Sequence, residues 1–339
     1  MLRGLQHRRE RRESAKYNNP SSAYFSTARC SFSVTHTSNH PLPSGHTLEG
    51  YRIERPIASG GFSIVYLAYD AQQAPLAIKE YLPQSLALRT TGETELRIPA
   101  EHQTEFQRGL HSFFEEARVL STLNHPHVVR VANFFRANGT AYMAMRLERG
   151  RTLHQHIHAL SGRIANADFL RLFDQLLQGL AAVHGAGLLH LDLKPANIWL
   201  RADNTPVILD FGAARFAVDI GPPAPRAMYT PGYAAPEQYH GNYTLGPWTD
   251  IYAIGACMYA TLGKTAPPAA DERLIDDDLL PARQRFSDHY PSRLLIAIDD
   301  CLRLSPALRP QSAHVLRDTL ITAGERGWPA WLRKLRQHL

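Results

Sequence analysis

The chain has 339 residues, of which 44% are hydrophobic, so it can bury the core of a sizeable globular enzyme. Its three cysteines (Cys30, Cys257 and Cys301) lie far apart without a CxxC pair, which argues against a disulfide framework or a cysteine zinc site and indicates a reducing compartment. The net charge of +6 is concentrated at the start, because residues 1–50 hold seven Lys or Arg and three Glu. The remainder is nearly neutral, so no nucleic-acid partner is expected for it.

Residues 1–47 are expected to form a disordered basic arm, since an arginine cluster precedes a Ser-, Thr- and Asn-rich run with little apolar periodicity. The arm has the composition of an organelle transit peptide, but a solvated tail or an upstream mis-assigned start codon explains it better. Candidates for phosphorylation by the chain itself are Ser21, Ser22, Ser26, Thr27, Ser31, Ser33, Thr35, Thr37 and Ser38.

A small β-rich region is predicted from Tyr51 onward. Alternating β-branched and aromatic residues predict a hairpin around a pair of glycines, and a third strand carries Lys79. Apolar residues at helical spacing predict a helix over 106–123. The 36 residues between Lys79 and Glu116 include residues 88–96, where an extra hairpin is expected.

The second region, which follows a linker at 146–150, is predicted to be mostly helical. The predicted helices are 168–183, 250–262, 292–304 and 311–320. Residues 323–339 form a short basic amphipathic tail, which either packs its tryptophans on this region or meets an anionic surface or a partner. Apolar stretches fall short of the roughly 20 residues of a membrane span, so no transmembrane segment and a cytoplasmic location are expected.

Six short segments occur in fixed order through both regions. They are Ala58-Ser-Gly-Gly-Phe-Ser-Ile-Val65, Ala77-Ile-Lys79, Glu116 before an apolar helix, His190-Leu-Asp-Leu-Lys-Pro-Ala-Asn197, Asp210-Phe-Gly212 and Ala235-Pro-Glu237. Any one could arise by chance, but all six in order are specific. The set resembles the eukaryotic-like Ser/Thr protein kinases, particularly their bacterial branch, over roughly residues 48–320.

The resemblance implies an α+β, protein-kinase-like bilobal fold over residues 48–322. The smaller, β-rich N-lobe with one main helix would span 48–145, a hinge 146–150, and the mostly α-helical C-lobe 151–322. It also implies a kinase that transfers the γ-phosphoryl group of ATP to Ser or Thr of protein substrates as part of signalling in a bacterium, with Mg²⁺ as the metal and Mn²⁺ able to substitute.

Site residues carry over from the matching motifs. Asp192 would accept or orient the proton of the acceptor hydroxyl, and Lys194 would contact the γ-phosphate. Thr230 would help to order the acceptor site. Asn197 and Asp210 would hold the metal ion, because oxygen ligands suit Mg²⁺.

Lys79 would pair with the α- and β-phosphates and with Glu116, for which Glu115 is a credible substitute. The expected nucleotide-binding set is Ile57, Ala58, Gly60, Gly61, Phe62, Ser63, Val65, Ala77, Lys79, Met145, Leu147 and Trp199. Gly60 and Gly61 would let backbone N–H groups approach the phosphates, although a tight strand turn without a ligand would look the same. Trp199 would form the floor of the adenine pocket, or would face away into the core.

Two further expectations concern structure and regulation. Glu237 would pair with Arg309, and Asp250 would brace the catalytic loop. The family commonly has an arginine at the position of Leu191, and residues 213–228 contain no Ser, Thr or Tyr. Activity is therefore expected without phosphorylation in that stretch.

Three other functions are weighed against the kinase. Ala58, Ser63 and Leu191 depart from the family pattern and would suit a catalytically weak pseudokinase scaffold. A small-molecule phosphotransferase of the aminoglycoside type shares the catalytic loop but lacks the Ala-Pro-Glu segment. A nucleic-acid binder would act through the arginine-rich arm and would show salt-dependent binding. A regulatory partner protein is a further expectation, since no sensor domain is seen.

Overall fold

The computed structural model describes residues 39–211, 215–216, 229–239 and 244–324. Contacts divide the chain into two units, residues 1–37 and 38–339, and every described residue belongs to the second unit. The expectations for the phosphorylation sites of the arm, for most of residues 213–228 and for the tail beyond residue 324 lie outside the described residues.

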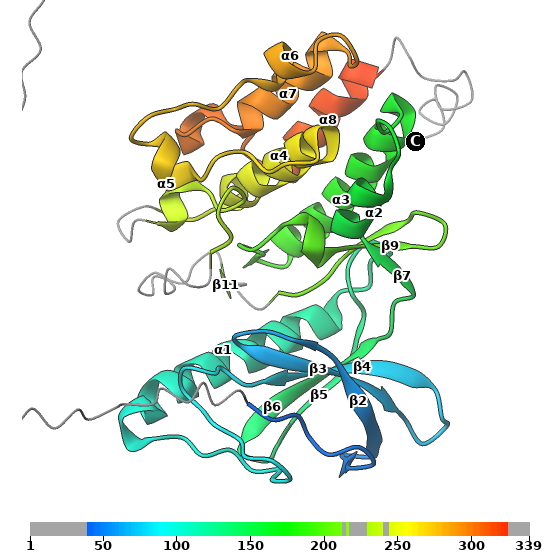
Figure 1. The fold of residues 1–339 in the computed structure, drawn as a ribbon, viewed down its shortest axis with the longest axis vertical. Coiled ribbons are helices and arrows are strands. Elements are labelled where there is room, and N and C mark those ends of the chain that lie inside the picture. Colours follow the sequence, from blue (N-terminus) through cyan, green and yellow to red (C-terminus); the bar gives the residue numbers. More distant parts are fainter. Residues whose placement is uncertain (1–38, 212–214, 217–228, 240–243, 325–339) are drawn as a thin grey trace, which may run out of the picture. The chain divides into compact units, whose positions relative to one another are not determined.

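The N-lobe is built on one six-stranded antiparallel sheet in the order β1-β2-β3-β4-β6-β5. Its strands are β1 (Thr47–Leu48), β2 (Tyr51–Ser59), β3 (Ser63–Tyr69), β4 (Pro75–Tyr81), β5 (Val131–Ala137) and β6 (Thr140–Arg146). Helix α1 (Gln103–Thr122) packs on β5 and β6 (Figure 1). It does so through buried residues spaced three or four apart, namely Phe106, Leu110, Phe113, Ala117 and Leu120.

Strand β4 carries two charged residues with different surroundings. Lys79 and Glu80 are both buried, at 4% and 0% exposure. Successive side chains of a strand point to opposite faces of its sheet. Lys79 therefore faces the catalytic residues while Glu80 lies on the opposite face, where it meets Arg89.

The packed chain begins before residue 48, where the kinase domain was expected to start. Asn39 and Leu42 are buried, and the Asn39 side chain bonds to the backbone of Ala87 and Arg89. The expectation of disorder up to residue 47 is therefore wrong for residues 39–47. The segment shows no apolar periodicity, so its order depends on side-chain and backbone hydrogen bonds to distant residues.

The segment between β4 and α1 is an insertion of residues 82–99. Leu88 and Arg97 form one isolated antiparallel bridge with reciprocal backbone hydrogen bonds of 2.9 and 2.8 Å. The hairpin expected over 88–96 is thus limited to this single bridge. A short 3-10 helix (Ala100–His102) then leads into α1.

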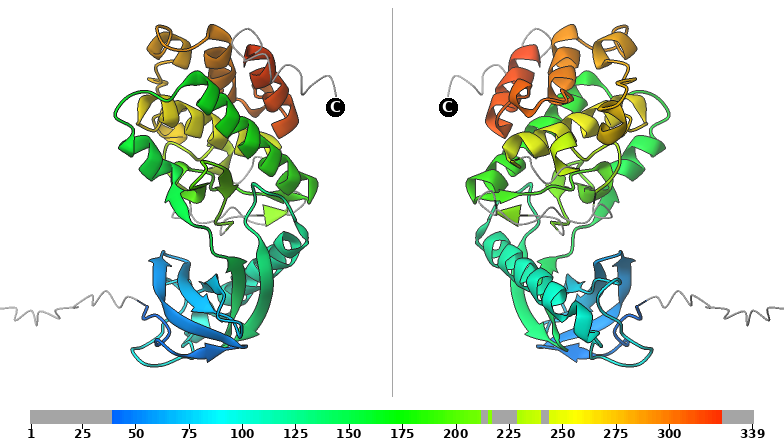
Figure 2. Two further views of the ribbon diagram at one scale, coloured as in Figure 1. Left: turned by 90° about the vertical axis from the view of Figure 1, so that its right-hand side faces the viewer. Right: turned by 90° about the vertical axis from the view of Figure 1, so that its left-hand side faces the viewer.

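The C-lobe is mostly helical, as expected (Figure 2). Its helices are α2 (Leu153–Ala159), α3 (Asn166–Gly185), α4 (Pro247–Gly263), α5 (Ala270–Arg273), α6 (Ala282–Arg285), α7 (Ser292–Cys301) and α8 (Ala313–Gly324). Its short strands are β7 (Gly150–Thr152), β8 (Leu188–Leu189), β9 (Ile198–Arg201), β10 (Pro206–Ile208) and β11 (Arg215–Phe216), with short 3-10 helices at Pro195–Asn197, Pro236–Gln238 and Pro306–Leu308.

Helix α4 is the central helix of this lobe. It packs on α7 and α8, and nearly all of its residues are buried, as is typical of a helix that is apolar all round. Asp250 in its first turn is the one charged residue of this helix, all of which is described. Among the described residues, no helix has the length and apolar character needed to cross a bilayer.

Candidate active site

The catalytic loop after β8 is held in a strained backbone conformation. Leu191 has a φ of 63°, in the left-handed region that costs a non-glycine residue about 1 kcal/mol or more. Both of its backbone groups are bonded: its N–H donates to Asp250 Oδ1 at 2.8 Å, and its carbonyl accepts from Gln238 Nε2 at 2.8 Å. Asp250 Oδ2 also accepts the His190 N–H at 2.8 Å. The predicted brace from Asp250 is confirmed.

Asp250 keeps its charge although it is fully buried. Burial acts to raise the pKa of this carboxyl, but the hydrogen bond and charge of His184 and the contacts of His190 outweigh it, so the pKa is lowered. The bracing carboxylate is therefore ionised at neutral pH and can accept all three hydrogen bonds.

Gln238 makes a contact to the catalytic loop that the sequence did not predict. Its side chain donates to Leu191 O and accepts from the Ala235 N–H at 2.9 Å, so it ties the catalytic loop to the Ala-Pro-Glu segment. It is 2% exposed. Its position directly after Glu237 was the only signal in the sequence, and a glutamine there does not by itself indicate a partner 47 residues away.

Three of the predicted catalytic residues and the predicted metal ligand Asn197 form one hydrogen-bonded cluster. Asp192 Oδ1 accepts from Thr230 Oγ1 at 2.8 Å, and Asp192 Oδ2 accepts from Lys194 Nζ at 2.7 Å and Asn197 Nδ2 at 3.0 Å. Lys194 Nζ also donates to Thr230 Oγ1 at 2.8 Å. The expected proximity of Thr230 to Asp192 and Lys194 is confirmed. A carboxylate and an ammonium group therefore meet at one hydroxyl, the type of group that a Ser or Thr substrate presents.

Lys79 of the N-lobe and Asp210 of the C-lobe form an ion pair that links the two lobes. Lys79 Nζ donates to Asp210 Oδ1 at 2.8 Å. The positive charge and hydrogen bond of Lys79 lower the pKa of Asp210 to about 2, so this carboxylate is ionised. Burial acts to lower the pKa of Lys79, but the Asp210 and Glu116 carboxyl groups outweigh it and the pKa is raised.

Glu116 lies close to this pair without the ion pair that was expected for it. It is 5% exposed, and burial raises its pKa to about 8, an effect that Lys79 only partly offsets. Among the described residues, Lys79 forms its ion pair with Asp210 and not with Glu116. Glu115 is not a substitute, because it pairs with Arg118 on the exposed side of α1.

Oxygen atoms suited to a hard divalent cation remain at Asn197 and Asp210. Within the part of the chain that the structure describes, the side-chain hydrogen bonds of Asn197 use its amide nitrogen and that of Asp210 uses Oδ1, so Asn197 Oδ1 and Asp210 Oδ2 could act as ligands. The Asp210 side chain is 51% exposed, so it can reach a bound group. The described residues contain no cluster of three His, Cys, Asp or Glu that could hold a metal. Two oxygen ligands suit a divalent cation that takes its other ligands from phosphates and water.

The glycine-rich loop joins β2 to β3. Neither Gly60 nor Gly61 has a positive φ, so the turn itself does not require glycine. A Cβ at Gly61 would meet nothing within 4 Å, and one at Gly60 would meet only Ser63 O at 4.0 Å. The turn is nevertheless tight, since the Gly60 N–H donates to Ser63 O at 2.9 Å, while the space beside both glycines would admit a ligand.

The other predicted nucleotide-binding residues lie on paired strands around the lobe junction. Ala58 pairs with Val65, and Ala77 pairs with Met145, so these four are fixed by the sheet register. Leu147, in the linker to β7, is half-buried. The remaining members of the set lie at the glycine-rich loop. Ile57, which is 41% exposed, is on β2, Phe62 is in the loop and Ser63 begins β3.

Trp199 lies on β9, where it pairs with Thr152 and Val207. It is half-buried and packs against the core, and its buried indole N–H has no hydrogen-bond partner in the described part of the chain. A Cβ at Gly150 would lie 3.0 Å from the indole nitrogen and 1.9 Å from Leu200 O. The glycine that ends the linker is therefore required for the close approach of β7 to the strand of Trp199.

The predicted Glu237–Arg309 pair is present and fully buried, with side chains 1% and 0% exposed. Arg309 Nη1 and Nη2 donate to Glu237 Oε1 and Oε2 at 2.7 and 2.9 Å, a bidentate geometry. Three carbonyl groups accept the remaining donors, those of Trp248, Arg303 and Leu304. This pair fixes the Ala-Pro-Glu segment on the helical core.

The two-lobed fold and this constellation define a protein kinase. The sequence matches the family model described as "Protein kinase domain" over residues 51–321. The chain belongs to the protein kinase family, and the expected fold class and recognition are confirmed.

Its relatives include bacterial enzymes of this family. The chain is 33% identical over 294 residues to "Serine/threonine-protein kinase PknA" of Mycobacterium tuberculosis, covering 83% of this chain and 64% of PknA. It is 30% identical over 287 residues to "Serine/threonine-protein kinase pkn3" of Myxococcus xanthus, covering 80% of this chain and 49% of pkn3. The chain thus spans about half the length of pkn3.

A solved structure titled "PpkA-294 apo form" is also similar. It is 35% identical, with a TM-score of 0.72, and the match covers 84% of this chain and 100% of that one. These findings support the bacterial branch of the Ser/Thr kinases and do not favour the pseudokinase scaffold.

Proposed function

We propose that the protein is an ATP-dependent kinase that transfers the γ-phosphoryl group to Ser or Thr of protein substrates in bacterial signalling. The observation that carries the proposal is the cluster in which Asp192 and Lys194 both bond to the Thr230 hydroxyl. An acceptor hydroxyl that reached the same two groups would have a carboxylate for its proton and an ammonium group beside its oxygen.

In this proposal Asp192 orients the acceptor hydroxyl and takes its proton, while Lys194 neutralises charge on the transferred phosphoryl group. Asn197 holds Asp192 in place through its amide nitrogen and offers its oxygen to a metal ion. The Thr230 hydroxyl bonds to both Asp192 and Lys194 and so holds their side chains close together. Positioning and charge neutralisation dominate because phosphoryl transfer has a loose transition state.

The nucleotide is proposed to bind between the lobes, with its phosphates beneath Gly60 and Gly61 and its base above Trp199. Mg²⁺ at Asn197 and Asp210, which Mn²⁺ can replace, would neutralise charge on the phosphates when bound. Lys79 would then exchange its present partner, Asp210, for phosphate oxygens and Glu116.

Partners and location follow from this chemistry. The substrates would be proteins with an exposed Ser or Thr, and a regulatory partner would bring the signal. A cytoplasmic site of action would give access to ATP, and the two described cysteines, which are free and buried, suit a reducing compartment. We also propose that the folded kinase domain ends near residue 322, with the tail following.

Activity is proposed to be independent of phosphorylation within residues 213–228. The side chain of Leu191 is 6% exposed and apolar, so it cannot pair with a phosphate as an arginine would. Asp250 and Gln238 hold the loop backbone without such a switch. Mapping of phosphopeptides from active protein would contradict this if activity required phosphate at Thr230 or Tyr229.

The test of the kinase is transfer of labelled phosphate from Mg·ATP to the protein itself and to a generic basic substrate. Asp192→Asn and Lys79→Met should each lower transfer by about 100-fold or more, because they remove the proton acceptor and the phosphate partner. Phosphoamino-acid analysis should find label on Ser or Thr.

Asp203→Asn is the matched control, since Asp203 is an exposed turn residue that accepts from the Thr205 N–H. It should transfer phosphate at the rate of the unmodified protein. Intact ATP binding without any transfer, in the unmodified protein, would overturn the proposed activity.

A further inference from the structure

The glycine-rich loop is hydrogen-bonded to the insertion that follows β4. Strands β3 and β4 pair as far as Ser63 and Tyr81, and the Leu82 N–H then donates to Phe62 O at 2.9 Å. Gln84 adds two bonds, from its backbone N–H to Gly61 O at 2.8 Å and from its side-chain Nε2 to Gly60 O at 3.1 Å. The ladder therefore continues along the loop that was predicted to cover the phosphates.

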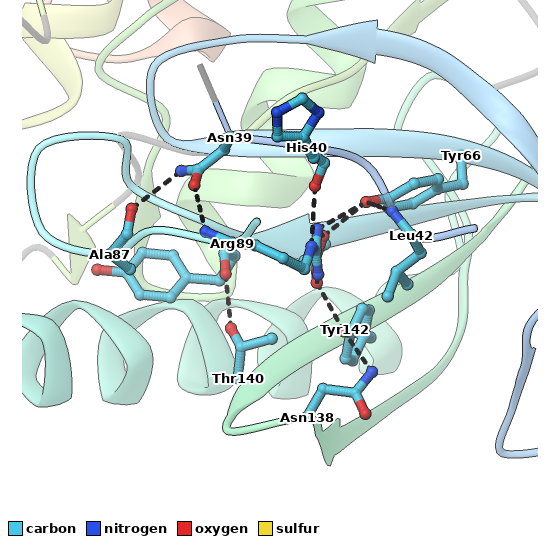
Figure 3. Close-up of polar contacts among 11 residues, drawn as sticks. Asn39, His40, Leu42, Tyr66, Ala87, Arg89, Asn138, Thr140 and Tyr142 are labelled. Atoms are coloured by element: carbon cyan, nitrogen blue, oxygen red, sulfur yellow. Dashed lines mark hydrogen bonds and ion pairs between the residues drawn. The ribbon is translucent and has the colours of Figure 1, made fainter. Parts of the chain in front are cut away.

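The insertion is anchored to the sheet by Arg89 (Figure 3). Arg89 Nη1 and Nη2 donate to Glu80 Oε1 and Oε2 at 2.7 and 2.6 Å, and both side chains are 0% exposed. The Tyr66 and Tyr142 hydroxyls donate to the same carboxylate at 2.7 and 2.6 Å. Glu80 thus accepts four hydrogen bonds on the face of β4 opposite Lys79.

The first residues of the packed chain complete the anchor. Arg89 Nε donates to His40 O at 2.8 Å, and the Arg89 N–H donates to Asn39 Oδ1 at 2.8 Å. Asn39 Nδ2 donates to Ala87 O at 3.0 Å, and the Leu42 N–H donates to Tyr66 Oη at 3.1 Å. Figure 3 shows Asn39, His40 and Leu42, from one segment, gathered with Tyr66 around Arg89. The insertion is therefore a fixed support rather than a free loop.

We propose that Gln84 is a positioning residue, which holds the carbonyl groups of Gly60 and Gly61 so that the loop is shaped for ATP phosphates before they bind. This inference rests on the proposed function. A loop held in its binding conformation loses less conformational entropy when the ligand binds, so the support should act on ATP affinity. It should act little on phosphoryl transfer, because Gln84 contacts none of the catalytic side chains.

The test is a comparison of Gln84→Met with Gln103→Met in the full chain. Methionine keeps the length of glutamine and removes its donor. Gln103 is the matched control, because its Nε2 donates to Ile98 O at 3.2 Å at the far end of the same insertion. Gln84→Met should raise the KM for ATP about three-fold or more, for the loss of one hydrogen bond, with kcat within two-fold and an unchanged Tm. Gln103→Met should change neither constant.

Amide hydrogen exchange of the protein without nucleotide gives a second readout that does not depend on activity. Gln84→Met should speed exchange at Gly60, Leu82 and residue 84, and Gln103→Met should not. An unchanged KM for Gln84→Met would overturn the inference, as would an equal fall in kcat and Tm in both variants. If the unmodified protein transferred no phosphate, the proposed function would fail, while the exchange data would still decide whether Gln84 holds the loop.

Discussion

In the described part of the chain, each lobe contains one fully buried arginine–glutamate pair, and the two pairs differ in how they are built. Glu237 and Arg309 in the C-lobe lie 72 residues apart, whereas Glu80 and Arg89 in the N-lobe lie nine apart. Arg309 uses its remaining donors on backbone carbonyl groups. Glu80 is instead surrounded by other side chains, since two tyrosine hydroxyls share its oxygens with Arg89.

The comparison shows what a buried ion pair needs in order to persist. The desolvation of two charges can exceed their mutual attraction, so such a pair survives only where nearly every donor and acceptor is satisfied. Both pairs meet this condition by different means. Glu116 is the contrasting case, a buried carboxyl without an ion pair, and its pKa rises to about 8. Substitutions at Arg309, Arg89 and Glu116 test the difference between a paired and an unpaired buried charge.

The largest expected loss is that of the C-lobe pair. Arg309→Met should lower the free energy of unfolding by about 3–5 kcal/mol, because Glu237 would keep a buried charge without its partner. Urea unfolding measures this. Arg303→Met is the control, since the Arg303–Asp300 pair is exposed and its loss should cost less than about 1 kcal/mol. Equal losses in the two variants would contradict the prediction.

Breaking the N-lobe pair should cost somewhat less. Arg89→Met should destabilise by about 3 kcal/mol, since two tyrosine hydroxyls would still solvate Glu80. Arg97→Met, which removes an exposed pair with Glu93 in the same insertion, should have almost no effect. A double-mutant cycle with Glu80→Gln should be less than additive, because the two residues interact directly. Strict additivity would show that the pair does not act as a unit.

Glu116 should make stability depend on pH. Its pKa is about 8 in the folded protein and near 4.5 when unfolded, so the unfolded chain releases a proton that the folded protein retains. The contribution of Glu116 to the free energy of unfolding is fully present below pH 4.5. It is lost as the pH rises toward 8, by at most about 1.4 kcal/mol per pH unit. Thermal unfolding of Glu116→Gln between pH 5.5 and 7.5 should lack this slope. Parallel curves for the two proteins would show that Glu116 does not titrate in that range.

The smallest effect is expected at Asn39, which bonds to the backbone of Ala87 and Arg89 in the insertion. Asn39→Ala removes two hydrogen bonds to the insertion and should destabilise by about 1–2 kcal/mol. Asn133→Ala serves as the control, because its side chain bonds to Tyr51 in an exposed position. If Asn39→Ala were as stable as the control, the first packed residues would not support the insertion.

Much of the catalytic centre was predicted from the sequence, because short motifs specify it locally. Asp192, Lys194 and Asn197 lie within six residues of one another, so the loop that holds them fixes their spacing in any member of the family. The pairing of Glu237 with Arg309 and the brace from Asp250 also followed from motif positions. Apolar periodicity located the main helices to within a few residues.

The tertiary structure alone decided the rest. Nothing near Arg89 in the sequence marks it as buried, since it bonds to Glu80, Tyr66 and His40 only when their segments converge, and Tyr142 bonds to Glu80 rather than to Arg89. The same is true of Gln238 and Gln84, whose partners are backbone carbonyl groups that any residue supplies. Lys79 bonds to Asp210 Oδ1 instead of Glu116, a choice that the motifs do not specify. Motifs specify which chemical groups are present. Burial and long-range hydrogen bonds arise from tertiary packing, which a short sequence motif does not specify.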